Sequence, residues 1–258
     1  MSQNVFISEI YKPNLVNPIL IQGLPGLGFV GKIAVDFLID QLKPKRLADL
    51  YSTYIGLPDG DMGVRVELDG TFMLPKYEFY AYTETEPNLL FLTGDIQPAA
   101  WGQYNVANAI LDFACRQGCN IVLCLGGYSI QGRRMDQVYT IGDNLKTVEE
   151  LRQLQGVQLA QSGAVKGAFG VLLGLAKQRD VKCFGLLGAT PGTHPDLRAA
   201  RNVLRVLAKV YRLPIELTDI DRKVEEMEGR VKKFREFQSA MPQQEQPSQT
   251  EVPRGYIS

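Results

Sequence analysis

The sequence is poor in the residues on which most metal and imidazole chemistry depends. Its 258 residues include one histidine, His194, and four cysteines. A zinc site needs about four Cys or His ligands at suitable spacing. Cys115 and Cys119 lie one helical turn apart, but no second pair of such ligands accompanies them. We therefore expect no metal and no cofactor, and we expect the cysteines to act as small apolar residues.

The sequence also lacks an excess of charge of either sign. Lys plus Arg total 28 and Asp plus Glu total 28, so the formal net charge is zero. Proteins that coat nucleic acid do so through a broad basic field that attracts phosphates. The charge balance therefore argues against nucleic acid as a partner.

No apolar run is long enough to cross a bilayer. The longest runs that are both uncharged and mostly apolar, at 121–130 and 167–176, are much shorter than the roughly 20 residues that a spanning helix needs. Residues 1–15 lack the basic start and apolar block of a secretory signal. We expect a cytoplasmic protein with no membrane partner.

Short apolar runs alternate with helical patterns along most of the chain. Runs that end in glycine are typical of strands buried on both faces of a parallel sheet; they lie at 18–23, 88–94, 121–127 and 181–188. Helical patterns follow them at 31–42, 101–117, 163–177 and 195–211. This alternation predicts an α/β fold, a three-layer α/β/α sandwich with a mainly parallel sheet.

Two regions depart from this rhythm. Residues 62–82 alternate in short β-type stretches around Asp69-Gly70, a strong hairpin signal, which predicts a meander inserted into the sheet. A further strand is expected over 50–55. Residues 128–162 carry turn-like interruptions, and we expect one short helix there, over 147–155.

The glycines Gly26, Gly28 and Gly31 form a G-x-G-x-x-G pattern between a predicted strand and a predicted helix. In a dinucleotide-binding turn this pattern places a helix N-terminus against a pyrophosphate. Such a turn also needs an acidic residue at the end of the second strand. Asp49 precedes the strand expected there and Asp59 lies in a turn, so neither fits well. The alternative is that the glycines permit a tight turn and close packing.

Other polar groups follow the predicted strands. Asp95, Gly127 and Tyr128 come after two of them, and loops of this kind converge at the carboxyl edge of an open α/β sheet. Together with the glycines of the turn, they are candidates to line a crevice. His194 stands before Pro195, at an expected helix N-cap.

No nucleophile, base and anion stabiliser come together among these residues. We therefore expect no catalytic residues and no enzyme activity. The alternative is a small-molecule protein, binding or hydrolysing a nucleotide or nucleoside in the crevice.

The sequence after the predicted core divides into two parts. We expect a core domain over 1–217, an amphipathic helix over 218–240 and a flexible tail over 241–258. Thr218 and Asp221 are placed for a capping box at the start of that helix. Its apolar stripe fits packing on its own domain or pairing with another subunit, and the pattern leaves both open.

The chain resembles the proteasome assembly chaperone 2 family in its archaeal and bacterial branch. The resemblance covers roughly residues 15–237 and depends on the order and spacing of several weak motifs. These are Gly26–Gly31 with Lys32-Ile33-Ala34, Leu92-Thr93-Gly94-Asp95-x-Gln97-Pro98, Gly126-Gly127-Tyr128, Ala189-Thr190-Pro191-Gly192 with the helix from Pro195, and the charged helix Asp219–Phe237.

The resemblance implies a fold similar to that of purine nucleoside phosphorylases, assembly into a homo-oligomer and no established catalytic residues. It implies proteasome core α subunits as partners, which some relatives bind through C-terminal tails ending in a hydrophobic residue, tyrosine and any last residue. Here Gly255 precedes Tyr256, which is third from the end. Tyr256, Ile257 and Ser258 are thus expected docking residues that depart from the usual pattern.

Overall fold

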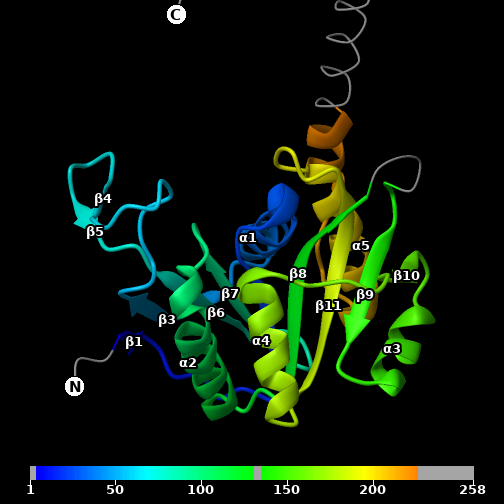
Figure 1. Ribbon diagram of the computed structural model, residues 1–258, viewed down its shortest axis with the longest axis horizontal. Helices are drawn as coiled ribbons and strands as arrows, with labels where there is room; N and C mark the ends of the chain where they lie inside the picture. The colour runs from blue at the N-terminus through cyan, green and yellow to red at the C-terminus, as the bar shows by residue number, and fades with distance from the viewer. Residues whose placement is uncertain (1–3, 131–134, 226–258) are drawn as a thin grey trace, which may run out of the picture.

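The computed structural model describes residues 4–130 and 135–225, and within them the strands form a nine-stranded sheet and a separate hairpin (Figure 1). The sheet order is β1-β3-β6-β7-β2-β8-β11-β9-β10, and the hairpin pairs β4 with β5. The strands are β1 (Val5–Glu9), β2 (Ile19–Gly23), β3 (Lys45–Ser52), β4 (Arg65–Val66), β5 (Phe72–Met73), β6 (Tyr77–Tyr82), β7 (Leu89–Gly94), β8 (Ile121–Ser129), β9 (Val138–Gly142), β10 (Val157–Leu159) and β11 (Lys182–Thr190).

Helices connect the strands. They are η1 (Leu27–Phe29), α1 (Val30–Leu42), η2 (Ala100–Gly102), α2 (Gln103–Arg116), α3 (Leu145–Arg152), α4 (Gly167–Gln178) and α5 (Leu197–Tyr211), and residues 218–225 are also helical. The strands β7, β2, β8 and β11 run parallel to one another at the centre of the sheet. Antiparallel strands extend it on both sides. The predicted α/β fold is confirmed.

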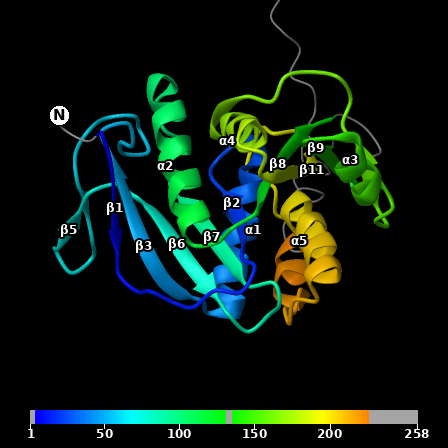
Figure 2. The ribbon, with the colours of Figure 1, turned by 90° about the horizontal axis from the view of Figure 1, so that it is seen from below.

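Helices cover both faces of the sheet, because the side chains of the central strands alternate between two apolar cores. Ile19 and Ile21 pack with α1 and α5, whereas Leu20 faces α2 and α4. Figure 2 shows the two helix pairs on opposite sides of the strands. These two cores on either side of one sheet make the three-layer α/β/α sandwich.

The strand expected over 50–55 is wrong in its bounds, because β3 spans Lys45–Ser52 and contains Asp49. A buried strand can hold Asp49 because its charge is paired. Asp49 is buried and accepts hydrogen bonds from Arg46 Nε at 2.8 Å and from Lys76 Nζ at 3.0 Å. Burial opposes the carboxylate charge, but these two hydrogen bonds outweigh it and lower the pKa of Asp49.

The region 62–82 differs from the predicted meander. Its hairpin at Asp69-Gly70 is confirmed, but β4 and β5 form a sheet of their own, and only β6 enters the main sheet. Gly70 has a φ of +83°, which places it in the left-handed region that closes a three-residue hairpin loop.

The expected N-cap at His194 is also wrong. The helix α5 begins at Leu197, and the Asp196 carboxylate caps it by accepting a hydrogen bond from the Ala199 amide at 3.0 Å. His194 lies outside the helix, exposed, with Nδ1 2.9 Å from Thr193 Oγ1. A carboxylate is a strong N-cap group, so the helix starts two residues later than the proline suggested.

The last described helix, residues 218–225, packs on the core. Ile220 and Val224 are buried in the core beside α5. The predicted capping box at Thr218 is not formed, because the Asp221 side chain instead pairs with Arg201 at 3.3 Å and Arg205 at 3.0 Å on α5. In its described part the helix therefore packs on its own domain.

Several expectations lie outside the described residues: the rest of the helix to residue 240, the tail 241–258, and the docking residues Tyr256, Ile257 and Ser258. Of the cysteines, Cys115 is exposed and the other three are buried, as expected of small apolar residues. Within the described ranges, no helix combines the length and hydropathy needed to span a bilayer.

The buried Asp49 pair gives a first test. We expect Asp49→Asn to lower the free energy of unfolding by about 2–3 kcal/mol at pH 7, because Arg46 and Lys76 lose a charged acceptor. Since the folded pKa of Asp49 is lowered, its stabilisation is present above the unfolded value of about 3.9. It is lost as pH falls through the folded value.

Urea unfolding of both proteins at pH 7 and pH 3 measures this difference. The matched control is Asp40→Asn, which removes the exposed Asp40–Lys43 pair and should leave the midpoint unchanged. Equal midpoints for wild type and Asp49→Asn at pH 7 would contradict the role of the pair.

Candidate functional site

A crevice of about 700 Å³ opens at the carboxyl edge of the parallel strands. It lies between the ends of β2, β8 and β11 and the segment 160–167 that leads into α4. Of the six candidate residues, Gly26, Gly127 and Tyr128 line it. Gly28, Gly31 and Asp95 are not among its lining residues, so the crevice brings together three of the six candidates.

The glycine turn, residues 26–31, lies directly against β8, so that the backbones of the two segments are in contact. A Cβ at Gly31 would stand 2.1 Å from the carbonyl oxygen of Leu125, and a Cβ at Gly127 would stand 2.3 Å from that of Leu27. No side chain fits at such distances, so both positions need glycine. The close contact with β8 therefore accounts for Gly31 of the glycine pattern, and for Gly127 on β8 itself.

The loop after β11 closes over the same turn. Gly28 is buried, and its carbonyl accepts a hydrogen bond from the Asp196 amide at 2.9 Å. Thr190 and the Asp196 side chain both lie against Gly28. Protein groups, one of them a carboxylate, thus lie close to the turn that a pyrophosphate would approach in a dinucleotide site.

Lys32, which follows the last glycine of the turn, is held by carboxylates. Its Nζ lies 2.8 Å from Asp36 Oδ2, 3.2 Å from Asp95 Oδ1 and 3.2 Å from Thr93 Oγ1. Asp95 also pairs with Arg65 at 2.8 Å. The structure therefore places Asp95 in an ion-pair cluster under the β4–β5 hairpin, and Lys32 already has anionic partners of its own.

The crevice itself is mainly apolar and holds few polar side chains. Gln22, at the end of β2, is buried, and its Oε1 has no hydrogen-bond partner among the described residues. Gln97 Nε2 donates to the Pro25 carbonyl at 2.6 Å, and its Oε1 accepts from the Ala168 amide at 3.1 Å. Gln97 thereby ties the glycine turn to the start of α4.

Tyr128 stands at the rim of the crevice. Its ring stacks on Tyr139 with centroids 4.3 Å apart, and its hydroxyl accepts a hydrogen bond from the Gln161 amide at 3.1 Å. These contacts fix the ring and tie β8 to the segment 160–167. The role of Tyr128 in the structure is to support the wall of the crevice.

Two important residues were not predicted. Gln22 is the one polar side chain in the apolar run 18–23, and this interruption was a signal that could have identified it. Gln97 lies in a motif used for the resemblance but was given no role. Its contacts join segments 72 and 71 residues apart, which no local pattern reveals.

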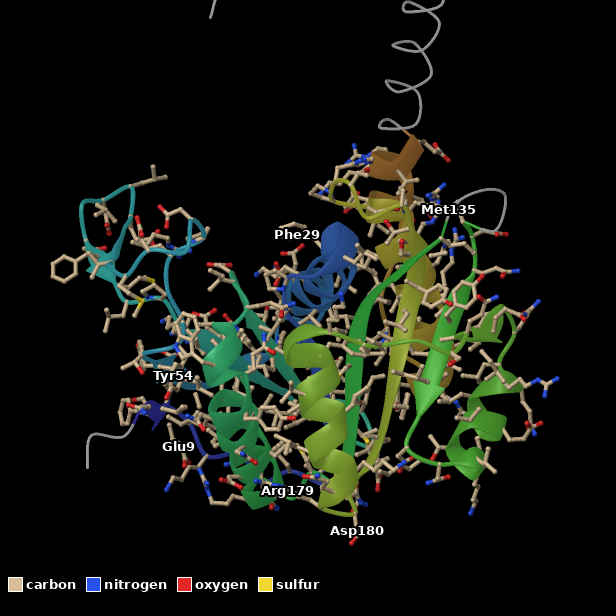
Figure 3. The ribbon with its side chains drawn as sticks, viewed as in Figure 1. Glu9, Phe29, Tyr54, Met135, Arg179 and Asp180 are labelled. Carbon is tan, nitrogen blue, oxygen red and sulfur yellow. The ribbon has the colours of Figure 1, made fainter. Side chains whose placement is uncertain are left out.

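The arrangement suits binding better than acid–base chemistry. Among the described residues, the crevice is lined by no histidine, cysteine or carboxylate. Ser129, Ser162 and Lys166 also line it. Within the part of the chain that the structure describes, no hydrogen bond joins either serine to the lysine, whereas an activated hydroxyl needs a base within hydrogen-bond reach. Figure 3 identifies the two edges of the sheet. Phe29, at the start of α1, lies at the carboxyl edge, and Arg179 and Asp180 lie at the opposite edge.

Comparison with known proteins finds relatives along nearly the whole chain. A sequence model of the PAC2 family matches residues 20–235. Pyrococcus furiosus PbaB, an archaeal proteasome activator, is 31% identical in a crystal structure that aligns with a TM-score of 0.82, over 90% of this chain and 99% of that one.

Two further relatives lie at similar identity. P. furiosus PbaA, an archaeal homologue of proteasome-assembly chaperone, is 28% identical with a TM-score of 0.72, over 90% of this chain and 96% of that one. An uncharacterised protein of Methanocaldococcus jannaschii is 29% identical over 88% of this chain and 86% of its own.

The close contact of the glycine turn gives a second test. We expect Gly31→Ala to lower the free energy of unfolding by about 1–3 kcal/mol, because the new methyl group must push α1 away from β8. The matched control is Gly174→Ala in α4, where no atom lies within 4 Å of the added Cβ. That change should stabilise by about 0.5–1 kcal/mol through helix propensity. Denaturant unfolding measures both, and equal effects would contradict the close contact.

Proposed function

The chain belongs to the PAC2 family, and we propose that it is a non-enzymatic, proteasome assembly chaperone-like protein that self-associates and binds proteasome core subunits. The observation that carries the proposal is the likeness to PbaB, which extends over 90% of this chain. PbaA, the homologue of proteasome-assembly chaperone, supports it at similar coverage.

The geometry of the sheet edge agrees with this proposal. The glycine turn is packed against β8. Lys32 and Asp95 form an ion pair with each other, and each also pairs with another charged side chain, Asp36 and Arg65 respectively. The crevice offers apolar walls and amides rather than an acid–base pair. A protein that binds a macromolecule needs a rigid scaffold of this kind, and it needs no reactive group.

We infer that the last residues of the sequence supply one contact with the proteasome α subunits. The helix 218–225 is fixed on α5 by Ile220 and Val224 and by the Asp221 ion pairs. The following segment therefore starts from a fixed point at the carboxyl edge (Figure 1). An aromatic and an aliphatic side chain at Tyr256 and Ile257 are groups that a pocket on a partner can capture.

Capture of proteasome α subunits by immobilised protein tests this contact. We expect the full chain to retain α subunits, and a chain ending at Ala240 to lose at least tenfold in affinity. Tyr256→Ala should weaken capture in the same direction, whereas Tyr104→Ala, at an exposed tyrosine of α2, should not. Equal capture by the full and shortened chains, or none by either, would refute tail docking.

A second candidate function is binding of a purine nucleoside or nucleotide in the crevice. Gln22 favours it, because its buried Oε1 has no hydrogen-bond partner among the described residues and is stabilised when a ligand supplies a donor. A glutamine amide can pair with the edge of adenine in this way. The crevice volume of about 700 Å³ lies in the range of small-molecule sites.

This candidate predicts that adenosine, ATP or NAD raises the melting temperature, because a ligand bound only to the folded form stabilises it. Gln22→Leu should abolish the shift while leaving the protein folded. Asn105→Leu, at an exposed amide outside the crevice, is the matched control and should keep the shift. No shift with any of the three ligands would remove the candidate.

A further inference from the structure

The β4–β5 hairpin is a short amphipathic element that stands away from the main sheet (Figure 1). Val66 lies directly opposite Phe72, and Arg65 directly opposite Met73. Because successive side chains of a strand point to opposite faces, the hairpin has two different faces. One carries Arg65, Glu67 and Met73, and the other carries apolar side chains.

The polar face attaches the hairpin to the body of the protein. Arg65 donates from Nε to Glu67 Oε1 at 2.8 Å and from Nη1 to Asp95 Oδ2 at 2.8 Å. Asp95 follows β7, and Lys32 of α1 holds it from the other side at 3.2 Å. The ion pairs thus fix which face of the hairpin turns towards the body.

The other face, which we call the hairpin face, is apolar and uncovered. It consists of the cross-strand pair Val66 and Phe72, of Val64 and Leu74 next to the two strands, and of Leu68 in the turn between them. Val66 is 66% exposed, Leu68 is 109% exposed and Phe72 is 71% exposed. None of these five side chains carries a charge or a hydrogen-bonding group.

An uncovered face of this kind is unfavourable on a protein that stays a monomer. Five side chains at these exposures present on the order of 500 Å² of apolar surface, which is near the upper end for a monomer. An isolated two-stranded hairpin is also marginally stable in water unless its apolar face packs on something. Nothing in the described residues covers the hairpin face.

We propose that the hairpin face is the contact by which two copies of this chain associate, hairpin against hairpin, about a two-fold axis. A face without charges is complementary to itself, and a two-fold contact uses the same patch on both copies. Two such faces together bury about 1,000 Å², the lower limit of a specific interface. The inference rests on the proposed self-association and names the surface that produces it.

A charge placed in the hairpin face tests the assignment. We expect Phe72→Asp to raise the dissociation constant of this contact at least tenfold, because the contact would bury a carboxylate without a partner. Sedimentation velocity of the full chain, over a range of concentrations, should show the mass fall by half. Phe6→Asp is the matched control, since Phe6 is a 53% exposed aromatic residue on the edge strand β1, and it should keep the wild-type mass.

Cross-linking gives a measurement that does not depend on a destabilising variant. In a Cys115→Ser background, which removes the exposed native cysteine, Leu68→Cys should cross-link two copies through a bis-maleimide reagent. Glu9→Cys, on β1 far from the hairpin, should remain uncross-linked.

The outcomes distinguish the assignment of the hairpin face from the proposed self-association. A wild-type oligomer whose mass Phe72→Asp does not change would overturn the hairpin assignment and leave self-association standing. A monomeric wild-type chain would refute self-association itself. If Phe72→Asp abolished capture of proteasome α subunits while leaving the oligomer intact, the hairpin face would belong to that partner and the second-copy assignment would be wrong.

Discussion

The backbone of η1 and α1 lies so close to β8 that neither Gly31 nor Gly127 has room for a side chain. This contact sets the distance between α1, the first crossover helix, and the sheet. Because of it, protein atoms occupy the space around the glycine turn. Gly28 then packs against Thr190, so the loop after β11 closes on the same turn. Residues of this contact, among them Leu27 and Gly127, also line the crevice, and Lys32 of the ion-pair cluster directly follows Gly31.

The placement of charge follows the same division. On the side of the antiparallel strands, acidic and basic side chains pair in clusters around Asp49 and Asp95. On the other side, the crevice is apolar and its amides mainly join segments of the chain. A fold of this kind is a rigid support, and among the described residues the hairpin face is an apolar surface that nothing covers. This division of charge is the reason that we propose the outer elements, and not the sheet edge, as the functional surfaces of this PAC2 family member.

Most of the sandwich could be predicted from the sequence, because buried parallel strands are apolar over their whole length and their helices alternate with them regularly. The start of β3 was predicted too late in the sequence. Its first residues include charged ones whose partners Lys76 and Glu78 are distant in sequence, which a local pattern does not reveal. The crevice was predicted through Gly26, Gly127 and Tyr128, since loops at the carboxyl edge converge by topology. Gln22 and Gln97 were missed because their role depends on burial and on long-range contacts, neither of which a local pattern contains.

The central claim is that this protein acts by binding a macromolecule through its outer elements while the packed glycine turn takes no part. Hydrogen–deuterium exchange of the full chain, measured with and without isolated proteasome α subunits, tests this most directly. The account predicts slower exchange in residues 241–258 on addition of the subunits, with no change in the turn 26–31. Slower exchange in the turn and in the crevice segment 160–167, with residues 241–258 unchanged, would contradict it.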